Sequence, residues 1–262
     1  MIYLVVCLTA LVAAGLTFFS GFGLGTLLLP ALALFFPVQI AVSATAVVHL
    51  LNNLFKLLLV GRHARLKVVL AFGLPATLSA LVGAWLLLRL ADLPALYDYD
   101  LWGRAAHVTP IKLVVAGLIL VFAVLDLLPG ERAVGFDRKW IPLGGVLSGL
   151  LGGLSGHQGA LRSAFLIKAG LGKEGFVGTG TACSVLVDLA RITVYGTSFL
   201  GDDLREIWQG PGWTVLAGAT VSAFVGSFVG ARLIRKVALT TLQRTVGAML
   251  MLAALALGAG VI

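Results

Sequence analysis

Four charged side chains lie deep inside apolar stretches of the chain, where an unpaired charge is costly. They are Lys56, Arg162, Asp188 and Arg191. Ionisable residues in such positions mark ion or substrate pathways more often than they serve packing alone. Three of the four are basic, and the guanidinium of Arg162 is a planar fork that matches the oxygens of a sulfonate, carboxylate or phosphate. These residue types predict the recognition of a small anion.

Two glycine-rich sequences interrupt the apolar stretches that must position these charges. They are SGFGLG at 20–25 and SGHQG at 155–159. The apolar tract 2–36 would measure roughly 50 Å as one straight helix, too long for a hydrocarbon core of about 30 Å. We therefore expect each tract to fold as two half-helices that enter and leave the membrane on one side. The half-helix N-termini would offer free N–H groups and a positive dipole end to an anion.

The composition excludes a soluble domain. Hydrophobic residues make up 60% of the chain and charged residues 11%, and the mean hydropathy is +1.06. Such a chain cannot present a polar surface to water and belongs in a bilayer. Cys7 and Cys183 are too few for a disulfide framework or a metal site.

Charged residues divide the chain into apolar tracts that are mostly about 20 residues long, enough to span a bilayer. The tracts are 2–36, 40–60, 68–90, 111–128, 141–170, 175–200, 211–234 and 240–262. Basic residues concentrate between tracts 2 and 3 and between tracts 7 and 8, which places both connections in the cytoplasm. If every tract crossed once, those connections would lie on opposite sides. Re-entrant first and fifth tracts put both connections inside, together with the basic connections 4–5 and 5–6. Both termini then lie outside, as do the acid-rich connections that contain Asp92, Asp98 and Asp100 and Asp202, Asp203 and Glu206.

A shift of 135 residues aligns the two halves of the chain. The matched positions are Ser20 with Ser155, Gly21 with Gly156, Asn53 with Asp188, Lys56 with Arg191 and Gly61 with Gly196. Residues 82–84 match 229–231 after a further 12 residues. We predict an all-α polytopic membrane protein of two inverted repeats, 1–128 and 141–262, joined by a cytoplasmic connector, 129–140. Each repeat would be a glycine-broken re-entrant hairpin plus three transmembrane helices, an architecture common among secondary transporters.

Two polar stripes are expected to face each other and the glycine breaks. In tract 6 the stripe is Thr181, Ser184, Asp188, Arg191 and Tyr195, at helical spacing. The matching positions of tract 2 are Ala46, His49, Asn53, Lys56 and Val60.

Each of these residues also has a structural interpretation. Arg162 and Asp188 would then be an ion pair that fixes helix packing. Lys56 and Arg191 would extend toward the membrane surface. His157 would cap the helix break, and its functional alternatives are an anion donor or a proton carrier.

The motif SGFGLGT at 20–26, followed by Pro30 and by AVSAT at 41–45, resembles the sulfite exporter (TauE/SafE) family. The resemblance covers nearly the whole chain. It implies a bacterial inner-membrane transporter of sulfite, thiosulfate, sulfoacetate or another organosulfonate. In the second half the family usually has a glycine-rich repeat with a proline, whereas this chain has GHQGALR at 156–162.

Because of that departure, we expect His157, Gln158 and Arg162 to determine which substrate is bound. We predict that the protein exports a small sulfur oxyanion or a C2 sulfonate. The predicted substrate-binding residues are Arg162, His157, Gln158, Ser20, Gly21, Gly23, Gly25, Ser155, Gly156 and Asn53. The predicted gating and coupling residues are Asp188, Arg191, Lys56 and His49, with Asp188 as a candidate proton carrier. No cofactor, metal or nucleic acid is implied.

Other functions share parts of this residue pattern. An anion channel, or a permease for another small organic anion, would share the basic site and stays open. A metal permease would need more intramembrane ligands than one aspartate and two histidines. An enzyme would need a nucleophile and a base, and the only candidates are Ser155 and His157, which have no adjoining carboxylate to orient them.

Overall fold

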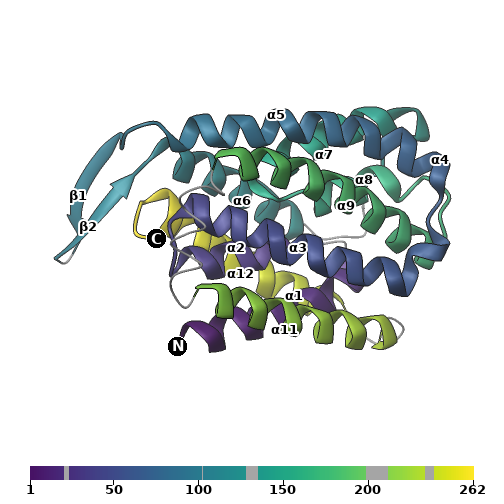
Figure 1. Ribbon diagram of the computed structural model, residues 1–262, viewed down its shortest axis with the longest axis horizontal. Helices are drawn as coiled ribbons and strands as arrows, with labels where there is room; N and C mark the ends of the chain where they lie inside the picture. The colour runs from purple at the N-terminus through teal and green to yellow at the C-terminus, as the bar shows by residue number, and fades with distance from the viewer. Residues whose placement is uncertain (21–23, 102, 128–134, 199–211, 234–238) are drawn as a thin grey trace.

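The computed structural model describes the whole chain except residues 21–23, 102, 128–134, 199–211 and 234–238. It is an elongated bundle of helices with a β-hairpin at one end (Figure 1). The long elements are α1 (Ile2–Ser20), α2 (Leu24–Ala33), α3 (Val38–Val60), α5 (Leu74–Ala91), α6 (Pro110–Leu127), α7 (Ile141–Ser155), α8 (Gly159–Leu166), α9 (Lys173–Ser198), α11 (Gly212–Leu233) and α12 (Leu239–Gly258). The short elements are η1 (Gly61–His63), α4 (Leu66–Val68), η2 (Val69–Gly73), β1 (Tyr97–Leu101), β2 (Arg104–Val108) and η3 (Arg138–Trp140).

The helices follow the predicted apolar tracts. The first and fifth tracts each contain two helices, α1 with α2 and α7 with α8, as the glycine-rich sequences predict. The break between α1 and α2, with Gly21 and Gly23, lies outside the described residues. The break between α7 and α8 is described and centres on Gly156, so the prediction of a broken fifth tract is confirmed.

Several helices are long and apolar enough to cross a membrane. Within the described residues they are Val38–His63, Leu66–Ala91, Lys173–Gly196 and Gly212–Arg232. Shorter apolar helices accompany them, among them Pro110–Val124 and Gly247–Gly258. Large apolar side chains such as Leu58, Leu78 and Leu252 are exposed on the outside of the bundle. The chain is therefore a multi-pass membrane protein.

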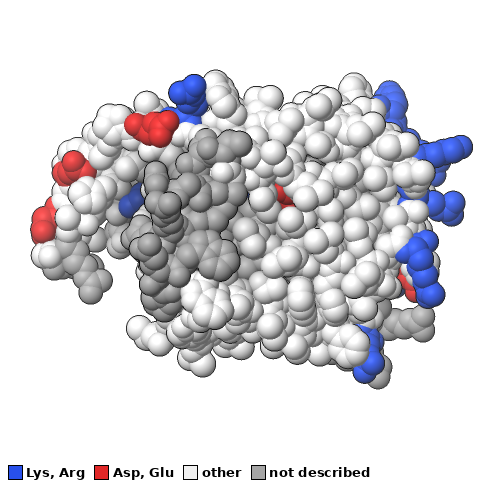
Figure 2. Space-filling model, viewed as in Figure 1, with Lys and Arg blue, Asp and Glu red and all other residues white. Residues whose placement is uncertain are grey.

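Charged side chains gather at the two ends of the bundle. Figure 2 shows Lys and Arg at the end that carries α4, and Asp on the β-hairpin at the other end. At the basic end His63 Nε2 lies 3.0 Å from Glu174 Oε2, and Arg138 Nε donates to Lys168 O at 3.3 Å. These contacts bring together three of the basic connections that the charge pattern assigned to one side. The acidic positions 202, 203 and 206 lie outside the described residues.

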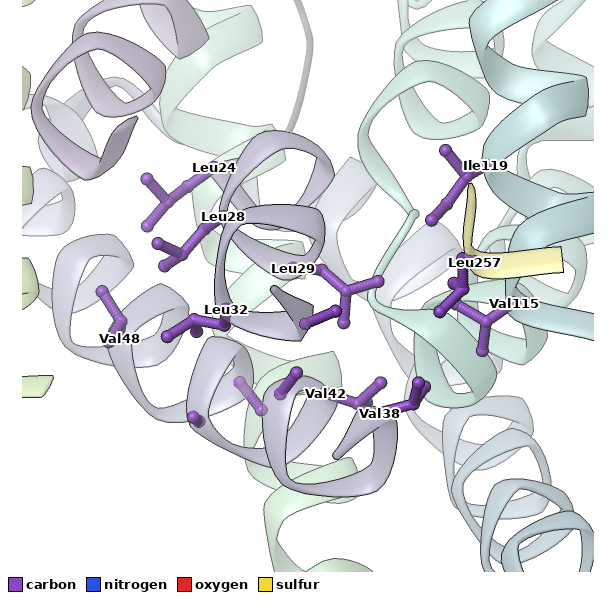
Figure 3. Packing of buried hydrophobic residues seen from close by; sticks show 14 of the residues in the cluster. Leu24, Leu28, Leu29, Leu32, Val38, Val42, Val48, Val115, Ile119 and Leu257 are labelled. Atoms are coloured by element: carbon purple, nitrogen blue, oxygen red, sulfur yellow. The ribbon is translucent and has the colours of Figure 1, made fainter. Parts of the chain in front are cut away.

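Helix α2 lies inside the bundle. Its Leu24, Leu28, Leu29 and Leu32 are completely buried. They pack in one cluster with residues of α3, α6 and α12, including Val42 (Figure 3). A helix that is apolar on all sides needs such surroundings, so a segment of only 10 residues is stable in this position.

Glycines allow two pairs of helices to pack with their backbones almost in contact. In the pair α1 and α11, a Cβ at Gly226 would overlap the carbonyl oxygen of Leu11, and one at Gly230 would approach that of Gly15. Residue numbers rise together along the contact, so the two helices run parallel. The pair joins the first half of the chain to the second.

The pair α5 and α7 repeats this arrangement. A Cβ at Gly149 would overlap Ala76 O, and one at Gly153 would overlap Ala80 O. These helices also run parallel and come from different halves. Each broken tract therefore packs its first helix against a helix of the other half.

Helices α3 and α9 cross in opposite directions, as do α6 and α12. Near the basic end Arg65 N donates to Thr179 Oγ1 at 3.0 Å, whereas farther along His49 meets Asp188. In the second pair Lys112 Nζ donates to Gly260 O at 3.2 Å, and farther along α6 a Cβ at Gly258 would contact Ala116.

The connection between α5 and α6 contains an antiparallel hairpin that the sequence analysis did not predict. Strands β1 and β2 pair with Tyr97 opposite Val108 and turn at Gly103, whose φ is 78°. The hairpin is joined to the end of α12, because Tyr99 Oη donates to Ala259 O at 2.6 Å.

Candidate functional site

Asp188 of α9 is the centre of a buried polar cluster. Its Oδ2 lies 2.7 Å from His49 Nδ1 and accepts from Asn53 Nδ2 at 3.0 Å. Its Oδ1 accepts from Arg191 Nε at 3.1 Å. None of the four residues is more than 3% exposed. The predicted contact between the polar stripes of α3 and α9 is confirmed.

The helix break in the fifth tract lies against this cluster. Helix α7 ends because Gly156 adopts a φ of 78°, a left-handed conformation that favours glycine. Gly156 N still donates to Gly152 O at 2.8 Å. A Cβ on Gly156 would lie 2.7 Å from Arg191 Nη1, so the absence of a side chain lets the guanidinium approach the backbone.

Replacing Gly156 with alanine is expected to cost about 1–2 kcal/mol from the left-handed backbone alone and to displace Arg191. The measurement is the melting temperature of the purified protein together with its affinity for anions. Ala160→Gly, in α8, is the control for a change of one methyl group. Equal stability and equal affinity in Gly156→Ala would contradict the close approach of Arg191.

Helices α2 and α3, from the first half of the chain, also pack near the break between α7 and α8. A Cβ at Gly25 would lie 3.4 Å from Gly156 O and 3.3 Å from the Thr45 side chain. Thr45 is 1% exposed. The two halves therefore meet where the second glycine-rich sequence interrupts its helix.

Several buried polar atoms around this break have no hydrogen-bond partner among the described residues. They are Thr45 Oγ1, His157 Nε2, Gln158 Oε1, Gln158 Nε2, Arg191 Nη1 and Arg191 Nη2. Arg191 Nη2 does lie within ion-pair distance of Asp188 Oδ1, at 2.9 Å, but without hydrogen-bond geometry. Buried polar groups are almost always hydrogen-bonded, because an unpaired one costs about 1–3 kcal/mol. These atoms make the break the candidate site for a polar ligand.

A hydrogen bond and an aromatic contact fix the position of the His157 ring. Its Nδ1 donates to Ser155 O at 3.0 Å, and its ring stacks on Phe122 with centroids 6.0 Å apart. Because Nδ1 carries the proton of this hydrogen bond, Nε2 of the neutral ring is an acceptor and becomes a donor on protonation. Nδ1 of His157 thus caps the last residue of α7, as one interpretation of this residue predicted, whereas Nε2 has no hydrogen-bond partner among the described residues.

Arg162 lies apart from the break, on α8. Its Nη1 donates to Ser184 Oγ of α9. Lys56 of α3 is buried and 5% exposed. The residue at the break is thus Arg191 and not Arg162, although the sequence analysis grouped Arg162 with His157 and Gln158. Arg191 is completely buried, so the alternative in which it extends to the membrane surface is wrong.

The side chain of Ser20 and the glycines at 21 and 23 lie outside what the structure describes. Of the substrate-binding residues predicted in that first motif, the structure places Gly25, against Gly156. Within the described residues, no group of three or more His, Cys, Asp or Glu side chains is arranged to hold a metal ion.

Residues 6–257 match the model of the family described as "Sulfite exporter TauE/SafE". The chain belongs to the sulfite exporter TauE/SafE family. No curated protein and no solved structure matches the chain. TauE/SafE proteins are membrane transporters of sulfite and related sulfur anions and not enzymes, and the match covers both halves of this chain.

Ser155 and His157 at the helix break are not arranged as a nucleophile and its base. Ser155 Oγ donates to Leu151 O at 3.1 Å, so its proton is directed into α7 and away from His157. This serine and histidine shape the helix break of a TauE/SafE transporter. The only acid that the structure places near them, Asp188, is engaged by three other donors.

Proposed function

We propose that this TauE/SafE protein is a secondary transporter that exports a small sulfur oxyanion or C2 sulfonate, such as sulfite, thiosulfate or sulfoacetate, across the bacterial inner membrane. The observation that carries the proposal is the set of buried, unpartnered polar groups at the break between α7 and α8. The family supplies the chemical class of the substrate.

The guanidinium of Arg191 would bind the sulfonate oxygens as a planar fork. The amide N–H groups of Gln158, the hydroxyl of Thr45 and protonated Nε2 of His157 would complete the oxygen contacts. Gln158 directly precedes α8, so the free N–H groups at that helix start add donors of their own.

Arg162, next to Ser184, and the buried Lys56 of α3 would supply further basic positions on the pathway. Asp188 and His157 are the two candidates for a proton carrier. Asp188 already accepts from three donors, which supports a fixed negative charge there and makes His157 the better candidate.

We infer that the chain is built from two inverted repeats, 1–128 and 141–262, joined by 129–140. Under the shift of 135 residues α3 corresponds to α9, and these helices run antiparallel, as inversion requires. The hydrogen bond between Asn53 and Asp188 joins two corresponding positions, so in this arrangement both would lie beside the pseudo-twofold axis. Substrate sites of inverted-repeat transporters lie near that axis.

The close contacts at glycines also support the proposal that the two halves are inverted repeats. Gly230 of α11 approaches Gly15 O of α1, and Gly83 of α5 approaches Leu150 O of α7. Gly15 corresponds to Leu150 by the shift of 135, and Gly83 to Gly230 by the shift of 147. The contact of α1 with α11 and the contact of α7 with α5 would therefore be equivalent, one in each half of the pseudo-symmetric structure.

We further propose that α7 with α8, and α1 with α2, are re-entrant. Phe165 of α8 lies beside Gly144 of α7, and Ser148 Oγ donates to Gln158 O at 3.1 Å. Helix α8 therefore returns along α7 toward the basic end. With that end in the cytoplasm, the hairpin of the second half enters from inside and that of the first half from outside.

Thermal unfolding of the detergent-purified protein tests the proposed site. Sulfite, thiosulfate and sulfoacetate are each compared with acetate and chloride. A sulfur anion at 100 times its dissociation constant is expected to stabilise the wild-type protein by roughly 2.7 kcal/mol. Gln158→Leu removes an unpaired amide, so it is expected to fold as well as the wild type while its affinity falls about tenfold, the loss of roughly one hydrogen bond to a charged group.

Gln39→Leu, at the start of α3, is the matched control and is expected to keep the wild-type affinity. A Gln158→Leu protein with unchanged affinity would show that the amide does not bind the anion. Transport in proteoliposomes that rises linearly with voltage and never saturates would replace the carrier by an anion channel.

A further inference from the structure

The face of α9 that carries the proposed site continues to the basic end of the bundle. The residues at steps of three and four before Asp188 are Ser184, Thr181, Gly178 and Glu174. Gly178 lies about 15 Å along the helix axis from Asp188. An anion that approaches the site along this face from the cytoplasm therefore has to pass Gly178.

The backbones of α3 and α9 touch at Gly178. A Cβ on this glycine would lie only 2.6 Å from Val60 O, at the end of α3, and 3.2 Å from Ala64 N. Gly178 is itself buried. Because the space does not hold even one methyl group, a sulfonate cannot pass between the two helices here. The structure is thus closed between α3 and α9 at the basic end.

Two polar contacts next to Gly178 join the same two segments. Arg65 N donates to Thr179 Oγ1 at 3.0 Å. His63 Nε2 lies 3.0 Å from Glu174 Oε2, and these side chains are 30% and 63% exposed. An exposed pair of this kind stabilises a contact only slightly, so the closure can be broken and made again in each transport cycle.

We propose that the end of α3 and the start of α9 form the cytoplasmic gate of the transporter, with the gating residues His63, Glu174, Gly178 and Thr179. The inference rests on the proposed function, because it concerns access to the proposed site. An exporter takes its substrate from the cytoplasm, and alternating access moves one part of such a protein against the other around the site. The segments therefore have to separate at Gly178 before an anion can reach the break between α7 and α8 from the basic end.

A cysteine behind the gate reports its opening. Thr181 lies between Gly178 and Asp188 on the same face of α9 and is 6% exposed. The full-length Thr181→Cys protein, with Cys7 and Cys183 replaced by alanine, is prepared in inside-out membrane vesicles. The rate of labelling by a membrane-impermeant maleimide then measures how often the gate opens to the cytoplasmic side.

Gly178→Ala is expected to raise this labelling rate about tenfold, because its methyl group forces α3 and α9 apart. Gly172→Ala, just before α9, is the matched control. A Cβ at Gly172 has no atom within 4 Å, so the labelling rate is expected to stay unchanged. Glu174→Gln weakens the exposed pair with His63 and is expected to give a smaller rise, about twofold.

A crosslink tests the gate without any change at the glycine. His63→Cys and Glu174→Cys are combined in the protein that lacks the native cysteines, and a short bismaleimide joins them. Uptake of radiolabelled sulfite, thiosulfate and sulfoacetate into inside-out vesicles is measured before and after the reaction. Uptake is expected to be lost in the double variant and to persist in each single-cysteine variant treated in the same way.

Undiminished uptake after crosslinking would overturn the gate and leave the proposed anion site standing. Equal labelling rates in Gly178→Ala and Gly172→Ala would also overturn it, because the contact with Val60 would then not control access. If no sulfur anion entered the untreated vesicles while Gly178→Ala still raised the labelling rate, the gate would stand and the proposed substrate class would fall.

Discussion

Replacing Arg191 with methionine is expected to lower the melting temperature sharply, because Asp188 would stay charged in the interior without its partner. Breaking a buried ion pair by removing one member costs about 3–5 kcal/mol, and here the carboxylate is completely buried. The measurement is thermal unfolding of the purified variant without anion. The response to sulfur anions should disappear as well, since the guanidinium beside Gly156 is lost.

A double variant separates these two effects. Arg191→Met combined with Asp188→Asn removes both charges, so it is expected to recover most of the lost stability, as replacement of a whole buried pair often does. It should not recover anion binding. A double variant as unstable as Arg191→Met alone would show that the unpaired carboxylate is not the cause.

A leucine at Gly149 is expected to prevent stable packing of α5 against α7. Its Cβ would overlap the carbonyl oxygen of Ala76 and also meet Ser79 Oγ. A backbone carbonyl cannot move aside as a flexible side chain does, so the helices must separate. Overpacking usually costs about 1–3 kcal/mol and occasionally more, and we expect the upper end of that range or beyond. The yield of monodisperse protein and its melting temperature are the measurements.

Gly117→Leu is the matched control. A Cβ at Gly117 has no atom within 4 Å, and its position in α6 gives leucine a good helical environment. It is expected to behave as the wild type or slightly better. Comparable yields and melting temperatures for both leucine variants would contradict the close packing of α5 on α7.

The helices could be predicted from the sequence because in a membrane their lengths follow from the hydrocarbon thickness, and charges mark their ends. The break at Gly156 was predictable for a related reason: the tract 141–170 is too long for one crossing. The hairpin of β1 and β2 was missed, although Tyr97 and Tyr99 alternate with Asp98 and Asp100 in the two-residue period of a strand.

The site was predictable in part. Helical spacing placed Asp188 and Arg191 on one face of α9, and the internal shift paired Asp188 with Asn53, which do form a hydrogen bond. Sequence alone could not assign Arg191 to the helix break, because that contact depends on how α7 crosses α9. The distance between Arg162 and the break depends in the same way on the course of α8.

The pairing of α1 with α11 and of α5 with α7 has a consequence for how the chain matures on the ribosome. Helix α5 meets its partner after about 60 further residues, whereas α1 must wait for about 200. At 5–20 residues per second that delay is on the order of 10–40 s. During that time the face of α1 that will receive the glycines of α11 contacts lipid or an insertion factor. The first helix to be synthesised is thus among the last to reach its final packing, and a chain that stops before α11 leaves it without a partner.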